Sequence, residues 1–188
     1  MGTIKTTNIE SISGSGTVTL GTSGETFALG SGVTVTGNGL VGITVADQWR
    51  ITANVTSDGD ITSNWERSDT APQGSLSAVT ESSGIFSFPS TGYWLVTFNA
   101  SGKTSGADSI AIQIHGTPDN SSYVALAYGA NGGTTMNQHA SCQTIIDVTD
   151  TSQVKVKMHA TSMAAGSLWY GASNETYTGT TFIRLGDT

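Results

Sequence analysis

The sequence is poor in charge, cysteine and proline. Of its 188 residues, only 11% are charged, three are proline and one is cysteine. Because Cys142 is alone, no intramolecular disulfide can form, and its position in a segment that leads into a strand indicates a small buried side chain rather than a nucleophile. Seven basic residues stand against fourteen acidic ones, for a net charge of −7. This balance excludes a basic surface for nucleic acid.

Long apolar runs are also missing. No stretch approaches the ~20 residues that a membrane-spanning helix needs, so the sequence predicts no membrane insertion. Residues 1–5 lack the apolar core of a signal peptide, which argues against a secretory route.

Small polar residues fill the remainder, with 24 glycines and many threonines. Few helix formers and many β-branched residues predict an all-β protein, and no window shows helical periodicity. Two segments alternate cleanly. Residues 108–115 place three isoleucines on one face and Gln113 and His115 on the other. Residues 154–159 turn Val154, Val156 and Met158 toward the core and leave Lys155, Lys157 and His159 outside.

The chain divides into two regions by composition. Within residues 1–45, a short unit of a strand and a glycine turn recurs at 17–21, 26–30 and 33–37. One unit alone buries too little to offset the ordering of its backbone, so the repeat predicts an intertwined β-stem, with a flexible linker as the alternative. Residues 46–188 carry many short strands separated by turns, a pattern typical of a β-sandwich or jelly roll. In this region residues 61–66 are expected to pair with residues 49–55.

Residues 84–100, GIFSFPSTGYWLVTFNA, are the most informative segment. They predict two strands joined by a tight turn, a hairpin, with Pro89 and Gly92 in the break. The spacing F-x-F-P-x-x-G-Y-x-x-x-F resembles the central signature of C1q-like domains, relatives of tumour necrosis factor. The resemblance extends over residues 46–188 and implies a homotrimer of two-sheet jelly rolls that binds rather than catalyses.

The N-terminal segment has a resemblance of its own. Residues 3–20, TIKTTNIESISGSGTVTL, are similar to the start of structural proteins predicted from marine bacteriophages. That similarity implies a virion protein whose N-terminal segment contacts other virion proteins. The apolar residues expected to make this attachment are Ile4, Ile9, Ile12, Val18 and Leu20.

One aromatic segment is a candidate ligand site. Trp169, Tyr170, Asn174 and Tyr177 surround a polar turn, as sugar-stacking residues often do. The alternative is that these aromatic residues fill the core or a subunit contact.

No pattern predicts catalysis, a cofactor or a metal ion. Residues 37–42 fit G-x-G-x-x-G, but no helix follows, so a dinucleotide site is not expected. The three histidines, at 115, 139 and 159, lie in separate segments without metal-ligand spacing and are interpreted as surface or interface residues. Asp58 and Asp60 are interpreted as turn residues rather than calcium ligands.

These observations lead to one hypothesis and its alternatives. The protein is expected to be a non-enzymatic homotrimer on a phage virion, with a C1q-like head that binds a host-surface glycan or protein, as on a tail fibre or spike. Several weak contacts on one particle would then add through effective concentration. The alternative is a capsid decoration protein that stabilises the shell at threefold sites. A secreted lectin or signalling ligand is a third class, which the N-terminal sequence disfavours.

Overall fold

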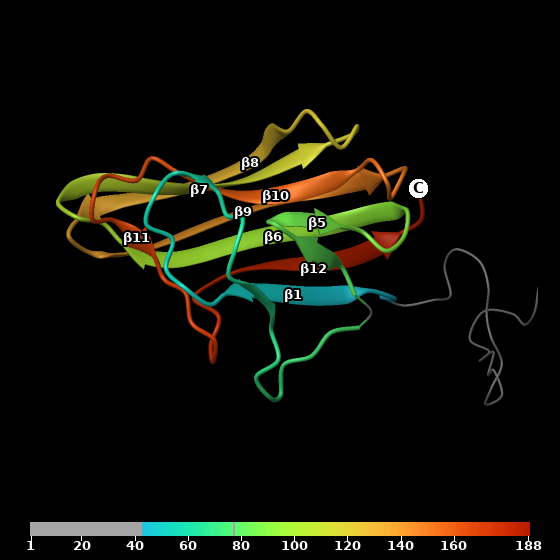
Figure 1. Ribbon diagram of the computed structural model, residues 1–188, viewed down its shortest axis with the longest axis horizontal. Coiled ribbons are helices and arrows are strands. Elements are labelled where there is room, and N and C mark those ends of the chain that lie inside the picture. The colour runs from blue at the N-terminus through green and yellow to red at the C-terminus, as the bar shows by residue number, and fades with distance from the viewer. Residues whose placement is uncertain (1–42, 77) are drawn as a thin grey trace, which may run out of the picture. The chain divides into compact units, whose positions relative to one another are not determined.

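The computed structural model describes residues 43–76 and 78–188, which form two antiparallel β-sheets (Figure 1). This described part of the chain is all-β and contains no helix, as the composition predicts. The attachment residues Ile4, Ile9, Ile12, Val18 and Leu20, and all but the last three residues of the predicted stem, lie outside the described residues.

The first sheet, sheet A, is built around two long central strands. Across the sheet the strands follow the order β9 (Asn137–Val148), β6 (Gly92–Lys103), β12 (Thr178–Gly186), β1 (Ala46–Ile51) and β3 (Trp65–Arg67). The short strand β11 (Leu168–Trp169) pairs with the end of β6. Ile51 lies opposite Trp65, so the predicted pairing of the segments 49–55 and 61–66 is confirmed.

The second sheet, sheet B, is also antiparallel. Its strands follow the order β8 (Val124–Thr134), β7 (Ala107–Thr117), β10 (Lys155–Thr161), β5 (Ile85–Ser87) and β4 (Thr80–Ser82), and β2 (Gly59–Asp60) also pairs with β10.

The predicted hairpin at residues 84–100 is wrong. Both strands exist, but β5 belongs to sheet B and β6 to sheet A, so the turn at Pro89 carries the chain from one sheet to the other. Phe88 lies in this crossing with its ring 5.1 Å from that of Trp94. Both a hairpin and a crossover between sheets need a turn between two apolar strands, so the sequence pattern alone does not distinguish the two arrangements.

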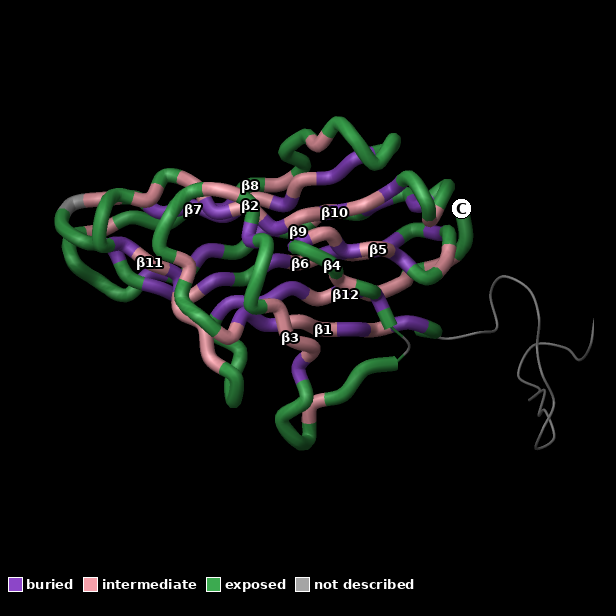
Figure 2. The backbone as a smooth tube through the Cα atoms, viewed as in Figure 1, coloured by how far each residue is buried: buried purple, intermediate pink, exposed green. Residues whose placement is uncertain are grey.

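The core lies between the sheets and consists mainly of inward-facing residues of the longer strands (Figure 2). Ile110, Ile112 and Ile114 are fully buried, which confirms the predicted alternation of this segment. Val156 and Met158 are likewise buried. Phe86 sits at the centre, with its ring 5.1 Å from those of Trp65 and Phe182 and 5.8 Å from that of Trp49.

Two buried charged side chains tie β1 to the segment that follows it. The carboxylate of Asp47 accepts hydrogen bonds from Arg67 Nε at 3.0 Å and from the backbone N–H of Val79 at 2.9 Å. Arg50 is also fully buried and donates from Nε to Glu66 Oε2 at 3.0 Å. A buried charge is tolerated only with such partners, since losing one costs about 3–5 kcal/mol.

Strands β8 and β9 form neighbouring edges of the two sheets. A Cβ atom at Gly129 of β8 would lie 2.3 Å from the carbonyl oxygen of Ser141 in β9, so only glycine permits this approach. Farther along the same edges, a groove of about 260 Å³ is lined in part by Val124, Leu126 and Ile145, all exposed. Apolar side chains thus remain uncovered where the sheets meet.

Candidate functional site

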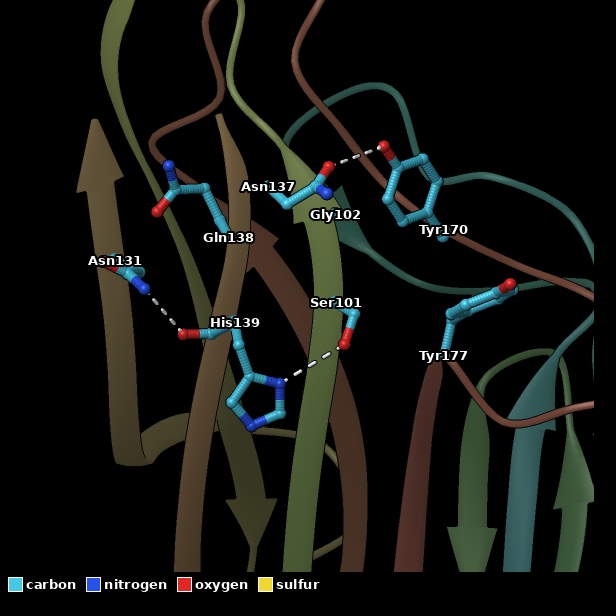
Figure 3. Close-up of a pocket in the computed structure, with 8 residues that line it drawn as sticks. All are labelled: Ser101, Gly102, Asn131, Asn137, Gln138, His139, Tyr170 and Tyr177. Carbon is cyan, nitrogen blue, oxygen red and sulfur yellow. Dashed lines mark hydrogen bonds between the residues drawn. The ribbon is translucent and has the colours of Figure 1, made fainter. Parts of the chain in front are cut away.

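A pocket of about 440 Å³ opens at the end of sheet A where β6 and β11 pair (Figure 3). Its lining combines aromatic, amide, hydroxyl and imidazole side chains and consists of Ser101, Gly102, Asn131, Asn137, Gln138, His139, Tyr170 and Tyr177. No carboxylate or amine occurs among these eight residues. The pocket therefore offers hydrogen bonds and aromatic surface but no strong charge.

Strand register assembles the pocket from distant parts of the chain. Ser101 of β6 lies directly opposite His139 of β9, so both side chains leave the same face of sheet A. Tyr177 immediately precedes β12, whose first residue pairs with Ala100. On the far side, Asn131 of β8 donates from Nδ2 to the carbonyl oxygen of His139 at 3.0 Å.

The two tyrosines form one side of the pocket. Their rings lie 5.8 Å apart at an interplanar angle of 60°. Tyr170 donates a hydrogen bond to Asn137 Oδ1 at 3.4 Å, while Tyr177 is 41% exposed. A hydrogen bond to the carboxylate of Glu175, and its negative charge, raise the pKa of the Tyr177 phenol, which keeps this hydroxyl protonated at neutral pH. An aromatic face beside polar groups suits a flat, hydroxyl-bearing ligand.

Polar groups form the floor of the pocket. His139 Nδ1 lies 3.3 Å from Ser101 Oγ, which holds the ring across β6 and β9 (Figure 3). The amide side chain of Asn137 and the imidazole of His139 together supply both donors and acceptors. Such a set recognises neutral polar groups rather than ions.

The structure brings together only part of the predicted aromatic site. Tyr170 and Tyr177 both line the pocket, while Asn174 is exposed but is not among its lining residues. Trp169 is fully buried in the core, so the prediction that it contacts a ligand at this surface is corrected. Its backbone pairs with Gly102 and with Val55, which holds the adjacent Tyr170 in place.

The remaining lining residues were missed because their only sequence signal is alternation. Asn137 and His139 occupy outward positions of a strand whose pairing partner the sequence does not specify. Cys142, three positions after His139 and on the inward face of the same strand, is buried, as predicted. Burial raises the pKa of its thiol to about 11, so it remains a neutral thiol.

The two antiparallel sheets and their strand order define the fold as a C1q/TNF-like jelly roll, as the motif at residues 84–100 implies. Among solved structures, Eiger TNF from S. frugiperda is similar at a TM-score of 0.59 and 14% identity, over 78% of this chain and 95% of that chain. Murine APRIL is similar at a TM-score of 0.55 and 8% identity, over 75% of this chain and 98% of that chain.

The globular domain of zebrafish complement 1qA protein is similar at a TM-score of 0.51 and 13% identity, over 77% of this chain and 99% of that chain. At these identities the likeness establishes the fold alone. The sequence matches no family model, and a search of curated proteins finds no relative. Among the described residues, no helix is long and apolar enough to cross a membrane.

Proposed function

We propose that the protein is a non-enzymatic homotrimer on a phage virion, whose C1q/TNF-like head binds a glycan on the host surface. The proposal has two supports in the head and one in the sequence. The head carries an apolar row suited to self-association and a pocket suited to a sugar. The phage assignment depends on the resemblance of residues 3–20 and on nothing in the described residues.

The observation that carries the proposal is an apolar row across the outward face of sheet A. Strand register places four side chains side by side on four neighbouring strands, in the order Ala46, Ile183, Leu95 and Ile145. Ile145 is 60% exposed and the other three are half-buried. A continuous apolar row across four strands of an outward sheet face suits a protein contact. Another copy of the same chain is the partner that the fold favours.

The pocket lies at the opposite end of the same face. Along β6 it begins at Ser101, six residues from Leu95, which corresponds to about 20 Å of extended chain. The intervening row contains Thr97 and Gln143, which are polar. Subunits can therefore meet at the apolar row while the pocket stays at the rim of the contact.

The pocket chemistry supports a saccharide. Tyr177 offers an exposed aromatic face, and Asn137 and His139 offer hydrogen-bonding groups beside it. A single site of this kind binds weakly, because little surface is buried. Three sites on one trimer, and many trimers on one particle, raise the effective affinity by about 10²–10⁴.

Tyr177→Ala is expected to weaken glycan binding at least about tenfold, because it removes the exposed stacking surface. The measurement is binding of the trimer to a glycan array, followed by titration of the best glycan. Tyr128→Ala serves as a matched control, because Tyr128 is exposed but lies outside the pocket. The variant should keep its trimeric mass. If Tyr177→Ala dissociates the trimer instead, the pocket is part of the subunit contact and the glycan assignment fails.

An antibody raised against residues 46–188 is expected to label the tips of tail fibres or spikes in electron micrographs of intact virions. The head would face outward there to meet the host. Gold particles spread over the shell would contradict a host-binding role and favour capsid decoration. Absence of label from every particle would contradict the virion assignment altogether.

A further inference from the structure

Sheet B carries a cluster of metal-ligating side chains on its outward face, away from the core. Asp60 comes from β2, His115 from β7 and His159 from β10. Strand β10 pairs with both other strands, and its register places His159 directly opposite Asp60 and Lys157 directly opposite His115. The cluster therefore joins segments that are far apart in the sequence. It contains two of the three histidines of the chain.

The ligand atoms of these three residues converge. All lie within 4.8 Å of one another. Asp60 Oδ1 is 2.8 Å from His159 Nδ1 and 3.9 Å from His115 Nδ1, and the two imidazole rings stack at 4.4 Å. Ligands bound tetrahedrally at about 2.0–2.1 Å from a metal are about 3.3 Å apart, which falls between these distances. The three side chains are thus close to the spacing that one ion requires.

A hydrogen bond outside the cluster orients one of the ligands. Gln113 Oε1 lies 2.7 Å from His115 Nε2, so Nε2 donates and carries the proton of the neutral ring. Nδ1 then presents a lone pair toward the Asp60 carboxylate. Two acceptors thus face each other at 3.9 Å, and Asp60 Oδ1 also accepts from Nδ1–H of His159 at 2.8 Å, a proton that a bound cation would replace. Most metal-bound histidines donate a hydrogen bond of this kind from the ring nitrogen that does not bind the metal.

The surrounding charges act in both directions, because the ammonium of Lys157 beside the cluster opposes a bound cation while it pairs with only one carboxylate oxygen. Lys157 Nζ lies 3.2 Å from Asp60 Oδ2, which leaves Oδ1 directed at the imidazoles. The net charge of −7 also favours the approach of a cation. The half-buried side chains remain accessible from solvent.

We propose that Asp60, His115 and His159 form a binding site for a divalent transition-metal ion, with Zn²⁺ as the expected occupant. Two imidazole nitrogens and one carboxylate oxygen suit Zn²⁺ rather than Ca²⁺, which prefers six to eight oxygen ligands. Three protein ligands leave a fourth position for water or for a group from a partner. The site lies on the sheet opposite the pocket and does not depend on the proposed function.

The test is titration of tag-free, chelator-treated protein with Zn²⁺ near neutral pH, by calorimetry and by thermal unfolding. We expect saturable binding of one ion per chain and a rise in Tm as Zn²⁺ is added. His115→Ala, His159→Ala and Asp60→Asn should each raise the Kd at least about tenfold. His139→Ala is the matched control, because it removes the remaining histidine, on the other sheet, and should leave the Kd unchanged. X-ray absorption at the zinc edge should show two imidazole ligands.

Three results would overturn the proposal. The first is a Kd weaker than about 1 mM for the wild-type protein. The second is an unchanged Kd for Zn²⁺ in all three variants, provided that each variant has the same Tm as the wild type in the presence of chelator and is therefore folded. The third is binding that His139→Ala abolishes. If a histidine variant fails to fold, Asp60→Asn still tests the site, because Asp60 is an exposed residue and asparagine has the same shape.

Discussion

Replacing Phe86 by alanine is expected to lower the free energy of unfolding by about 3–5 kcal/mol. Phe86 of sheet B is fully buried and contacts the rings of Trp49, Trp65 and Phe182, all of which belong to sheet A. Three aromatic neighbours are rigid and collapse poorly into the space that the ring leaves. The loss therefore combines the transfer energy of the ring with a persistent cavity.

Urea unfolding at one fixed protein concentration measures this loss, because the stability of an oligomer depends on concentration. Tyr128→Ala removes a ring of similar size from an exposed position and should change stability by less than about 0.5 kcal/mol. A loss below about 1.5 kcal/mol for Phe86→Ala would contradict the central position assigned to this residue.

Ile145→Asp is expected to convert the proposed trimer to a monomer. The side chain is 60% exposed in the isolated chain, so the substitution leaves the folding of one head nearly unchanged. In a contact formed by the apolar row, the same substitution places an unpaired carboxylate against apolar neighbours in every subunit. Each such charge costs several kcal/mol, enough to dissociate the assembly.

Sedimentation equilibrium distinguishes the outcomes, since the chain mass is 19.3 kDa and the trimer has three times that mass. Ser109→Asp is the matched control, because it adds the same charge at an exposed position of sheet B. A trimer that persists in Ile145→Asp would show that the row on sheet A is not the contact. A wild-type protein that is monomeric at micromolar concentration would contradict the homotrimer itself.

Local chemistry predicted much of the fold. Alternation identified the strands that contain Ile112 and Val156 together with their buried faces, because the period of a strand is a property of its own backbone. The pairing of strands could not be predicted in the same way. The turn at Pro89 is compatible with a hairpin and with a change of sheet, and only the packing of Phe86 against sheet A selects the second.

The candidate pocket was predictable only in its aromatic part. Tyr170 and Tyr177 stand out as aromatic residues near a polar turn, whereas Ser101 and His139 become neighbours only through the register of β6 and β9. Trp169 carries the same sequence signal as Tyr170 but points in the opposite direction, as adjacent strand residues must. A strand of two residues is too short for its sequence to show which side chain faces the core.

The proximity of Asp60, His115 and His159 was inaccessible for the same reason. No two of these residues share a segment, so no motif with fixed spacing could indicate them. Their meeting depends on β10, which pairs with both other strands. Metal-ligand spacing along the sequence detects local sites, while a sheet creates sites across its strands.

The placement of β1 has a mechanical consequence. Ala46, at the start of β1, lies opposite Ile183 near the end of β12, and β1 runs antiparallel to β12 through five paired residues. When the opposing load acts at the pocket, at the far end of the sheet, a pull transmitted through the chain that precedes Ala46 would load these hydrogen bonds together, in shear, instead of opening them one after another. The buried link from Asp47 to Arg67 would bear part of the same load. A head tethered through its N-terminus would therefore resist the detachment of β1 from sheet A under load.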